Sequence, residues 1–323
     1  MGDGLLLVLS VTFGSLLLGL LTRESAQRLS RRVARKLPEG SRLLKLVAIF
    51  VLNPVPIANS FWRLSLAGGP LVAFPFLGVF SIAVGGATAI AFNRIFRVPP
   101  KRAASVFTAG AFTNILSIGG LTVFAFFGHD AYALVPLFNT FIAFSYYAVG
   151  FPLSHKLSMD DPAEFSFSAR LIVERPYLLT PVIAMAIGLV LNVLDVPRPL
   201  AMDTVSAILI PLASALIGFS IGLTLFWGRI RDYAKEVALV AVIKFLVVPA
   251  IMIPLGIAIG LPGLMDGIAF RVLVILSVMP VAFNALVPPV VYGFDLDLAN
   301  SAWIVTTLGL IPILPILYFT LVH

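Results

Sequence analysis

The segment SVMPVAFNALVPPVVYG, residues 277–293, interrupts a chain that otherwise consists of long apolar runs. It contains Pro280, the adjacent pair Pro288 and Pro289, and one strongly polar residue, Asn284. Proline in a helix interior removes a backbone donor, clashes with the preceding turn and costs about 3 kcal/mol. Irregular backbone at membrane depth persists only where protein or a wet cavity surrounds it. The segment therefore predicts a membrane helix that breaks and exposes backbone groups and an asparagine to a ligand.

The composition of the chain predicts a polytopic, all-α membrane protein. Its 323 residues are 60% hydrophobic and 11% charged, whereas soluble domains are about 45–50% apolar and about 25% charged. The absence of cysteine excludes disulfides and thiolate metal sites. Segments of about 20 apolar residues cross a bilayer, and we expect ten of them. Their predicted ranges are 4–22, 43–61, 68–93, 103–127, 131–151, 176–194, 203–226, 235–260, 267–291 and 298–321.

Basic residues alternate between the two sides of this predicted topology. Most of the 22 Lys and Arg residues lie in or beside the loops after the odd-numbered segments, and the opposite loops hold Arg63 and Arg198. Because basic loops stay in the cytoplasm, we expect both termini outside, in a bacterial inner membrane. The basic run RESAQRLSRRVARK, 23–36, is expected to set this topology and contact anionic lipid head groups. The net charge of +7 therefore predicts a bilayer partner and no nucleic acid.

The chain divides near its middle into two halves of five segments. The polar stretch PLSHKLSMDDPAEFSFSAR, 152–170, separates a first repeat, 1–165, from a second, 166–323. An odd number of segments in each half means that the halves are inverted relative to one another, as in many secondary transporters. The fourth segment, TAGAFTNILSIGGLTVFAFFGHD, 108–130, matches the ninth at two offsets. One pairs Asn114 with Met279 and the other pairs it with Asn284, and the sequence leaves both alignments open.

The irregular features of the fourth and ninth segments fall at the same depth. Asn114 lies near the middle of the fourth segment, and Met279 and Pro280 lie near the middle of the ninth. Two broken helices that cross there would direct half-helix N-termini, which carry partial positive charge, toward one point. Pro280 is expected in the first turn of such a half-helix. We therefore expect a substrate site formed by Asn114, Ser117, Met279, Pro280 and Asn284.

Lys244 and Arg271 are basic residues inside predicted segments. Lys244 lies about nine residues from the cytoplasmic end of the eighth segment. One possibility is that its ammonium extends toward the membrane interface. The other is a functional role, in which it attracts an anion or pairs with a polar group. Arg271 is one turn from the outer end of the ninth segment, so we expect its guanidinium to extend to the membrane interface.

Several runs of the sequence resemble the auxin efflux carrier, or PIN-like, transporters. These runs are TNILSIGGLTVFAFFG (113–128), MPVAFNALVPPVVYGFD (279–295), ALIGFSIGLTL (215–225), VIKFLVVP (242–249) and TTLGLIPILP (306–315). The short central loop is similar to that of bacterial-type members. The resemblance implies a scaffold of segments 1–2 and 6–7 and a transport domain of segments 3–5 and 8–10. It also implies an X-shaped crossover of segments 4 and 9, elevator-type alternating access, a homodimer, and a small organic anion as substrate. We expect this anion to be a carboxylate.

The sequence also allows functions other than the transport of an organic anion. The bile acid:sodium symporters have a related fold but are expected to carry a carboxylate and a glutamine in the second crossover helix, and the ninth segment contains neither Glu nor Gln. A membrane sensor or channel on the same fold is a further alternative. GFSIG, 218–222, matches a hydrolase motif but lies in an apolar helix, and DDPAE, 160–164, reads as a solvated linker. We therefore expect no catalytic residue, no metal and no cofactor.

Energy coupling is left open by the sequence. No segment carries a carboxylate in its central part, so neither a proton relay nor an acidic sodium ligand is visible. Hydroxyls such as those of Thr113 and Ser117 could still coordinate sodium. Coupling to sodium or protons, facilitated diffusion and export driven by the membrane potential are all compatible with the sequence.

Overall fold

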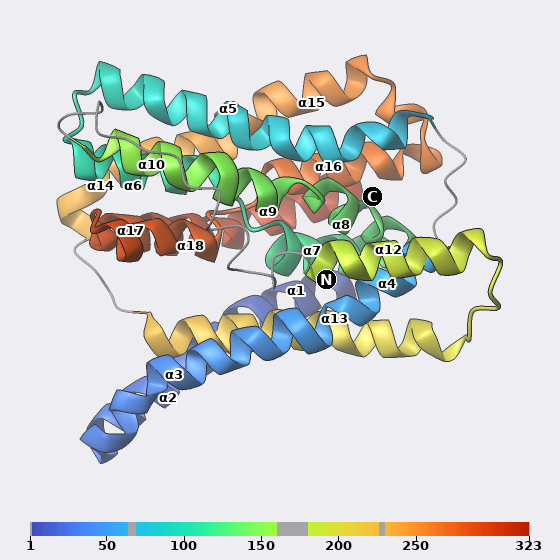
Figure 1. Ribbon diagram of the computed structural model, residues 1–323, viewed down its shortest axis with the longest axis horizontal. Helices are drawn as coiled ribbons and strands as arrows, with labels where there is room; N and C mark the ends of the chain where they lie inside the picture. The colour runs from blue at the N-terminus through green and yellow to red at the C-terminus, as the bar shows by residue number, and fades with distance from the viewer. Residues whose placement is uncertain (1, 64–68, 160–179, 226–229, 323) are drawn as a thin grey trace.

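The computed structural model describes residues 2–63, 69–159, 180–225 and 230–322 (Figure 1). In this part of the chain the secondary structure is helical, apart from one isolated bridge between two residues. Seven helices are long and apolar enough to cross a membrane, and two shorter apolar helices accompany them. The chain is therefore an integral, multi-pass membrane protein.

The helices form two layers (Figure 1). The first layer contains α1 (Asp3–Leu9), η1 (Ser10–Gly14), α2 (Ser15–Leu29), α3 (Arg31–Val47), η2 (Ala48–Leu52), α4 (Pro54–Arg63), α12 (Thr180–Val193) and α13 (Ala201–Thr224). Its most extensive pairings are α4 with α12 and α2 with α13. The second pairing depends on Gly19 and Gly222, because a Cβ on either would collide with the backbone of the other helix. Two chain segments far apart in sequence thus pack without intervening side chains.

The second layer contains the remaining helices (Figure 1). In the first half of the chain these are η3 (Gly69–Ala73), α5 (Phe74–Ile95), α6 (Pro100–Ala111), η4 (Ile115–Gly119), α7 (Gly120–Tyr132), α8 (Leu134–Asn139), α9 (Ile142–Ser145), η5 (Tyr146–Gly150) and α10 (Phe151–Leu157). In the second half they are η8 (Ile230–Tyr233), α14 (Ala234–Val242), η9 (Ile243–Val247), α15 (Val248–Ala258), η10 (Leu261–Gly263), η11 (Met265–Gly267), α16 (Ile268–Ser277), η12 (Phe283–Leu286), α17 (Val287–Tyr292) and α18 (Leu296–Leu321). The apolar core of the protein lies mainly in this layer.

The predicted segments and the observed helices agree in part. The fifth predicted segment, 131–151, is divided among short helices, whereas the ninth, 267–291, is broken between α16 and η12 as predicted. The sixth is covered by α12, which the structure describes only from residue 180. The count of ten segments and their inversion remain predictions, and the boundary at residues 165 and 166 and the DDPAE stretch lie outside the described residues.

The basic run after the first segment was predicted to be a loop, and this prediction is wrong. The run 23–36 is helical, apart from an extended Ser30, because α2 continues to Leu29 and α3 begins at Arg31. Arg, Lys, Gln, Glu and Ala are good helix formers, so this polar run prolongs both membrane helices. The two helix ends project beyond the rest of the molecule (Figure 1).

Candidate functional site

The two broken helices of the second layer meet at their breaks. Between α6 and η4, residues 112–114 are not helical, and between α16 and η12 the break covers residues 278–282. The backbone N–H of Asn114 donates to the carbonyl of Pro280 at 2.9 Å, and the N–H of Ala282 donates to the carbonyl of Phe112 at 2.9 Å. Thr113 is thereby bridged to Val281 in antiparallel fashion. The breaks form one crossing, held by reciprocal backbone hydrogen bonds.

Hydroxyl groups from neighbouring helices satisfy the next two backbone donors of the crossing. The N–H of Thr113 donates to the Tyr146 hydroxyl at 2.8 Å, and the N–H of Val281 donates to Thr306 Oγ1 at 3.2 Å. The Tyr146 ring also stacks on Phe112, with ring centroids 4.0 Å apart. Unpaired backbone groups are costly away from water, so these side chains make the irregular backbone stable inside a membrane.

Lys244 lies behind the crossing and does not reach the interface. Its side chain is 1% exposed, and Nζ donates to Thr113 Oγ1 at 2.6 Å. No ion pair among the described residues involves Lys244. Lys244 therefore contacts one of the two broken segments directly. This agrees with the expectation that it pairs with a polar group and contradicts the expectation that its ammonium reaches the membrane interface.

A cavity of about 260 Å³ lies between the two layers at the crossing. It is lined by residues of both layers, and no carboxylate occurs among the lining residues that the structure describes. Its polar lining consists of Lys45, Asn53, Thr113, Asn114, Ser117, Asn139, Tyr146, Tyr147 and Asn284. Ligand cavities commonly measure about 300–1,000 Å³ and carry a few polar groups on a mostly apolar wall. The cavity thus fits a small molecule with hydrogen-bonding groups.

Lys45 supplies the positive charge of this cavity. It lies on α3 in the first layer, and its Nζ is 3.4 Å from the centre of the Phe283 ring in the second layer. The cation–π contact joins the two walls, and no ion pair among the described residues involves Lys45. From the sequence, Lys45 was grouped with the basic residues in or beside the loop after the first segment and was given no site role. Its position within a long helix, two turns from Asn53, is the signal that could have identified it.

Asn114, Ser117 and Asn284 line the cavity together. The side chain of Asn114 accepts a hydrogen bond from the N–H of Ile118 at 3.2 Å, so it caps η4. Its Nδ2 has no hydrogen-bond partner among the described residues and remains a donor for a ligand. Asn284 is exposed to the cavity. These three residues were expected at the site from the sequence, and their contact with a substrate stays a prediction.

Met279 and Pro280 do not line the described cavities. Met279 is fully buried, beside Gly119. Pro280 was predicted in the first turn of a half-helix, which is wrong: it lies inside the break, because the next helical turn begins at Phe283. The ring removes an N–H where the chain is extended, and the carbonyl of Pro280 accepts from Asn114. The pair Pro288 and Pro289 instead opens α17.

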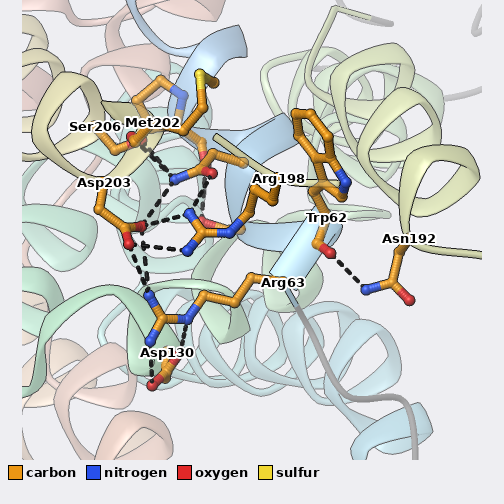
Figure 2. A network of polar contacts seen from close by, with 11 residues as sticks. Trp62, Arg63, Asp130, Asn192, Arg198, Met202, Asp203 and Ser206 are labelled. Atoms are coloured by element: carbon orange, nitrogen blue, oxygen red, sulfur yellow. Dashed lines mark hydrogen bonds and ion pairs between the residues drawn. The ribbon is translucent and has the colours of Figure 1, made fainter. Parts of the chain in front are cut away.

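An ionic cluster joins the layers at one end of the molecule, here called the Arg63 end (Figure 2). Arg63 of α4 pairs with Asp130 of the second layer and, at 3.3 Å, with Asp203 of α13. Arg198 makes bidentate contacts of 2.7 and 2.9 Å with Asp203 and a contact of 3.1 Å with Asn59. The hydrogen bonds to Asp203 raise the pKa of Arg198, which keeps its charge.

The two cations of this cluster, Arg63 and Arg198, are the two basic residues that were expected in the loops of the outer side. Arg63 and Arg198 both have acidic partners, so the Arg63 end carries little unbalanced positive charge. Trp62 and Asn192 extend the network, since Asn192 donates to the Trp62 carbonyl at 2.7 Å (Figure 2). The large cavity is lined by the crossing and also by Lys45 of α3 and Pro181 of α12, which are both far along their helices from the Arg63 end.

Five π-helical turns occur in the described part of the chain, at η1, η2, η4, η5 and η9. Each contributes a residue to the crossing or to a cavity beside it, namely Thr12, Ile49, Ser117, Tyr146 and Lys244. A π-turn displaces side chains locally and often marks functional positions. Among the described residues, no group of three or more His, Cys, Asp or Glu could hold a metal ion.

The fold defines a helical, multi-pass membrane protein, and comparisons with known proteins identify its family. The model of the membrane transport protein family, which includes the auxin efflux carriers, matches residues 69–318. The chain belongs to this family, as its resemblance had indicated. It is also similar to an uncharacterized transporter of Methanothermobacter thermautotrophicus, with 25% identity over 279 residues, covering 86% of this chain and 88% of the relative.

Proposed function

We propose that the protein is a secondary transporter that carries a small organic anion, most simply a carboxylate, through the cavity at the crossing. The observation that supports this is the charge of the cavity. Lys45 lines it, Lys244 lies behind Thr113, and no acid occurs among its described lining residues. The free amide donor of Asn114 and the N-terminal end of η4 add partial positive charge at the same place. An anion would be favoured there and a cation disfavoured.

The two layers suggest how the cavity would change sides. The first layer serves as the scaffold, and the second, which carries the crossing, moves relative to it as an elevator. In this proposal the Arg63 end faces outside, so the described conformation opens toward the cytoplasm while the Arg63–Asp130 ion pair closes the outer side. Movement of the second layer would break this ion pair and the contact between Lys45 and Phe283, because both cross the layer boundary.

The proposed transport does not require sodium. Thr113 was one of the hydroxyls that could coordinate sodium, and in the structure its oxygen accepts a hydrogen bond from the Lys244 ammonium. A sodium ion bound to the same oxygen would lie close to a positive charge, which is unfavourable in a weakly screened interior. When protonated, Lys244 would instead place a positive charge directly behind the crossing.

The test is a thermal-shift screen of the purified protein against small carboxylates, with sodium replaced by potassium. A ligand that binds only the folded state raises the melting temperature, and one carboxylate class is expected to do so in both salts. Lys45→Gln should then weaken its binding about 10-fold or more, as expected for a lost hydrogen bond to a charged group. Arg42→Gln, an exposed position on the same helix, is the control.

Three results would contradict the proposal. Stabilisation by cationic or neutral compounds but by no anion would exclude an anion site. Equal carboxylate affinity in Lys45→Gln and Arg42→Gln would show that the cavity with Lys45 does not hold the substrate. A strict sodium requirement would favour a sodium-coupled symporter instead.

A further inference from the structure

A second, much smaller cavity lies beside Asn114 and Ser117, which line both cavities. Its volume is about 20 Å³. Thr12 and Ser214 contribute to it from the first layer, and Trp303 and Thr307 from the second. Trp303 and Thr307 are four residues apart on α18 and therefore share a helix face. The small cavity thus lies at the boundary along which the two layers meet.

Three residues that line this cavity each have a buried polar atom with no hydrogen-bond partner among the described residues. These atoms are Thr12 Oγ1, Trp303 Nε1 and Thr307 Oγ1. All three residues are buried, with exposed fractions of 8%, 3% and 1%. Leaving a buried donor or acceptor unpaired is costly, and such groups in proteins almost always have a partner or an ordered water. Three of them around one cavity therefore point to a bound molecule.

We propose that this cavity binds one water molecule, which bridges the two layers. A water needs about 10–15 Å³ of such space and makes about three hydrogen bonds, and both requirements match the cavity. The indole N–H of Trp303 can only donate, so the occupant must offer a lone pair. A water oxygen accepts from Trp303, while its two hydrogens reach the Thr12 and Thr307 hydroxyls. A metal cation would instead face the indole N–H, and the described lining includes no carboxylate.

The water complements one direct polar contact at the same boundary. Ser214 Oγ donates to the carbonyl of Ser117 at 3.2 Å. Water-mediated hydrogen bonds are almost as favourable as direct ones and can be exchanged. The bridging water satisfies three polar groups while the layers are in contact, and it can stay with either surface when they separate. This site does not depend on the nature of the substrate.

The experiment compares two variants on α18 by melting temperature. Thr307→Val removes the hydroxyl at nearly constant shape, and with a water present it should lower the melting temperature by about 2–4 °C, because the remaining groups lose a partner. Ser301→Ala is the matched control. Ser301 Oγ is also buried without a partner among the described residues, but it lines none of the cavities described above, so its removal should leave the melting temperature unchanged or raise it.

An empty cavity predicts the opposite sign for Thr307→Val. Removal of a hydroxyl that has no partner would then raise the melting temperature or leave it unchanged, as in Ser301→Ala, and would overturn the proposal. The second measurement is an experimental structure of the wild-type protein at a resolution that shows ordered waters. An oxygen peak within hydrogen-bond distance of the three atoms supports the water site, and empty density excludes it. Stabilisation of the wild type by sodium but not potassium, lost in Thr307→Val, would identify a cation and also overturn it.

Discussion

At the scale of single residues, Asn114 combines two functions in one side chain. Its Oδ1 accepts from the N–H of Ile118 and caps η4, while its Nδ2 is available to the cavity. Side-chain caps of this kind contribute about 0.5–2 kcal/mol. Replacement by alanine would remove both groups at once, so it cannot separate a structural role from binding.

Asn114→Asp separates the two roles. The aspartate keeps an oxygen that can cap η4, but it exchanges the amide donor for a negative charge. We expect the melting temperature of the empty protein to change little and the carboxylate affinity to fall at least about 10-fold, because two carboxylates would face each other. Thermal shifts with and without the carboxylate measure both. Unchanged affinity would remove Asn114 from the substrate site.

Some residues of the candidate site are brought to it only by the tertiary structure. Lys45 was not distinguishable by composition from the basic residues that precede it, since its position at the site depends on the Phe283 ring and the cavity. Asn114 and Asn284 were identifiable because a strongly polar residue at membrane depth is rare. Met279 was expected at the site from depth alone, but depth does not determine the direction of a side chain, and Met279 is directed into the core.

At the scale of elements, the positions of the two helix breaks were predictable and their pairing was not. Pro280 and the Asn114 region signal irregular backbone through lost donors and polar side chains. Which residues meet is a tertiary property. The structure pairs Thr113 with Val281, a pair that neither sequence alignment considered. The helical conformation of the run 23–36 was missed because polarity indicated a loop, while the helix-forming tendency of Arg, Lys and Ala prevails.

Lys244 of η9 donates a hydrogen bond to Thr113 of the crossing, and this contact between two elements can be tested. Thr113→Val removes the acceptor of the Lys244 ammonium and should destabilise the protein by about 1.5–3 kcal/mol. Adding Lys244→Met should recover part of the loss, because the buried charge is then absent. Melting temperatures of the single and double variants measure this coupling.

Thr122→Val is the control for this pair. Thr122 is also fully buried, but its hydroxyl donates to Ile118 within the same chain segment at 2.8 Å. A double variant as unstable as Thr113→Val alone would show that the bond to Lys244 is not the source of the effect.

At the scale of the whole molecule, the two layers and the ionic cluster make the conformational change testable. The chain contains no cysteine, so Asn284→Cys introduces the sole thiol of the protein, in the large cavity. In the proposed conformation a membrane-impermeant thiol reagent reaches it from the side opposite the Arg63 end. Asp130→Asn removes a contact that holds this conformation and should reduce labelling from that side about two- to fivefold, in line with the modest strength of exposed ion pairs.

Asp195→Asn is the matched control, because Asp195 is exposed near the same end and takes part in no ion pair among the described residues. It should leave labelling unchanged. If Asp130→Asn also leaves labelling unchanged, the Arg63–Asp130 contact does not determine which side is open.

The exposure of this ion pair has a consequence for the surrounding medium. The side chains of Arg63 and Asp130 are 35% and 55% exposed, so dissolved ions reach both. Screening acts over about 8 Å at physiological ionic strength and over shorter distances in more concentrated salt, whereas the buried contact of Lys244 is shielded from it. The ionic strength on one face of the membrane would thus influence how readily the layers separate there, and this effect requires no dedicated ion site.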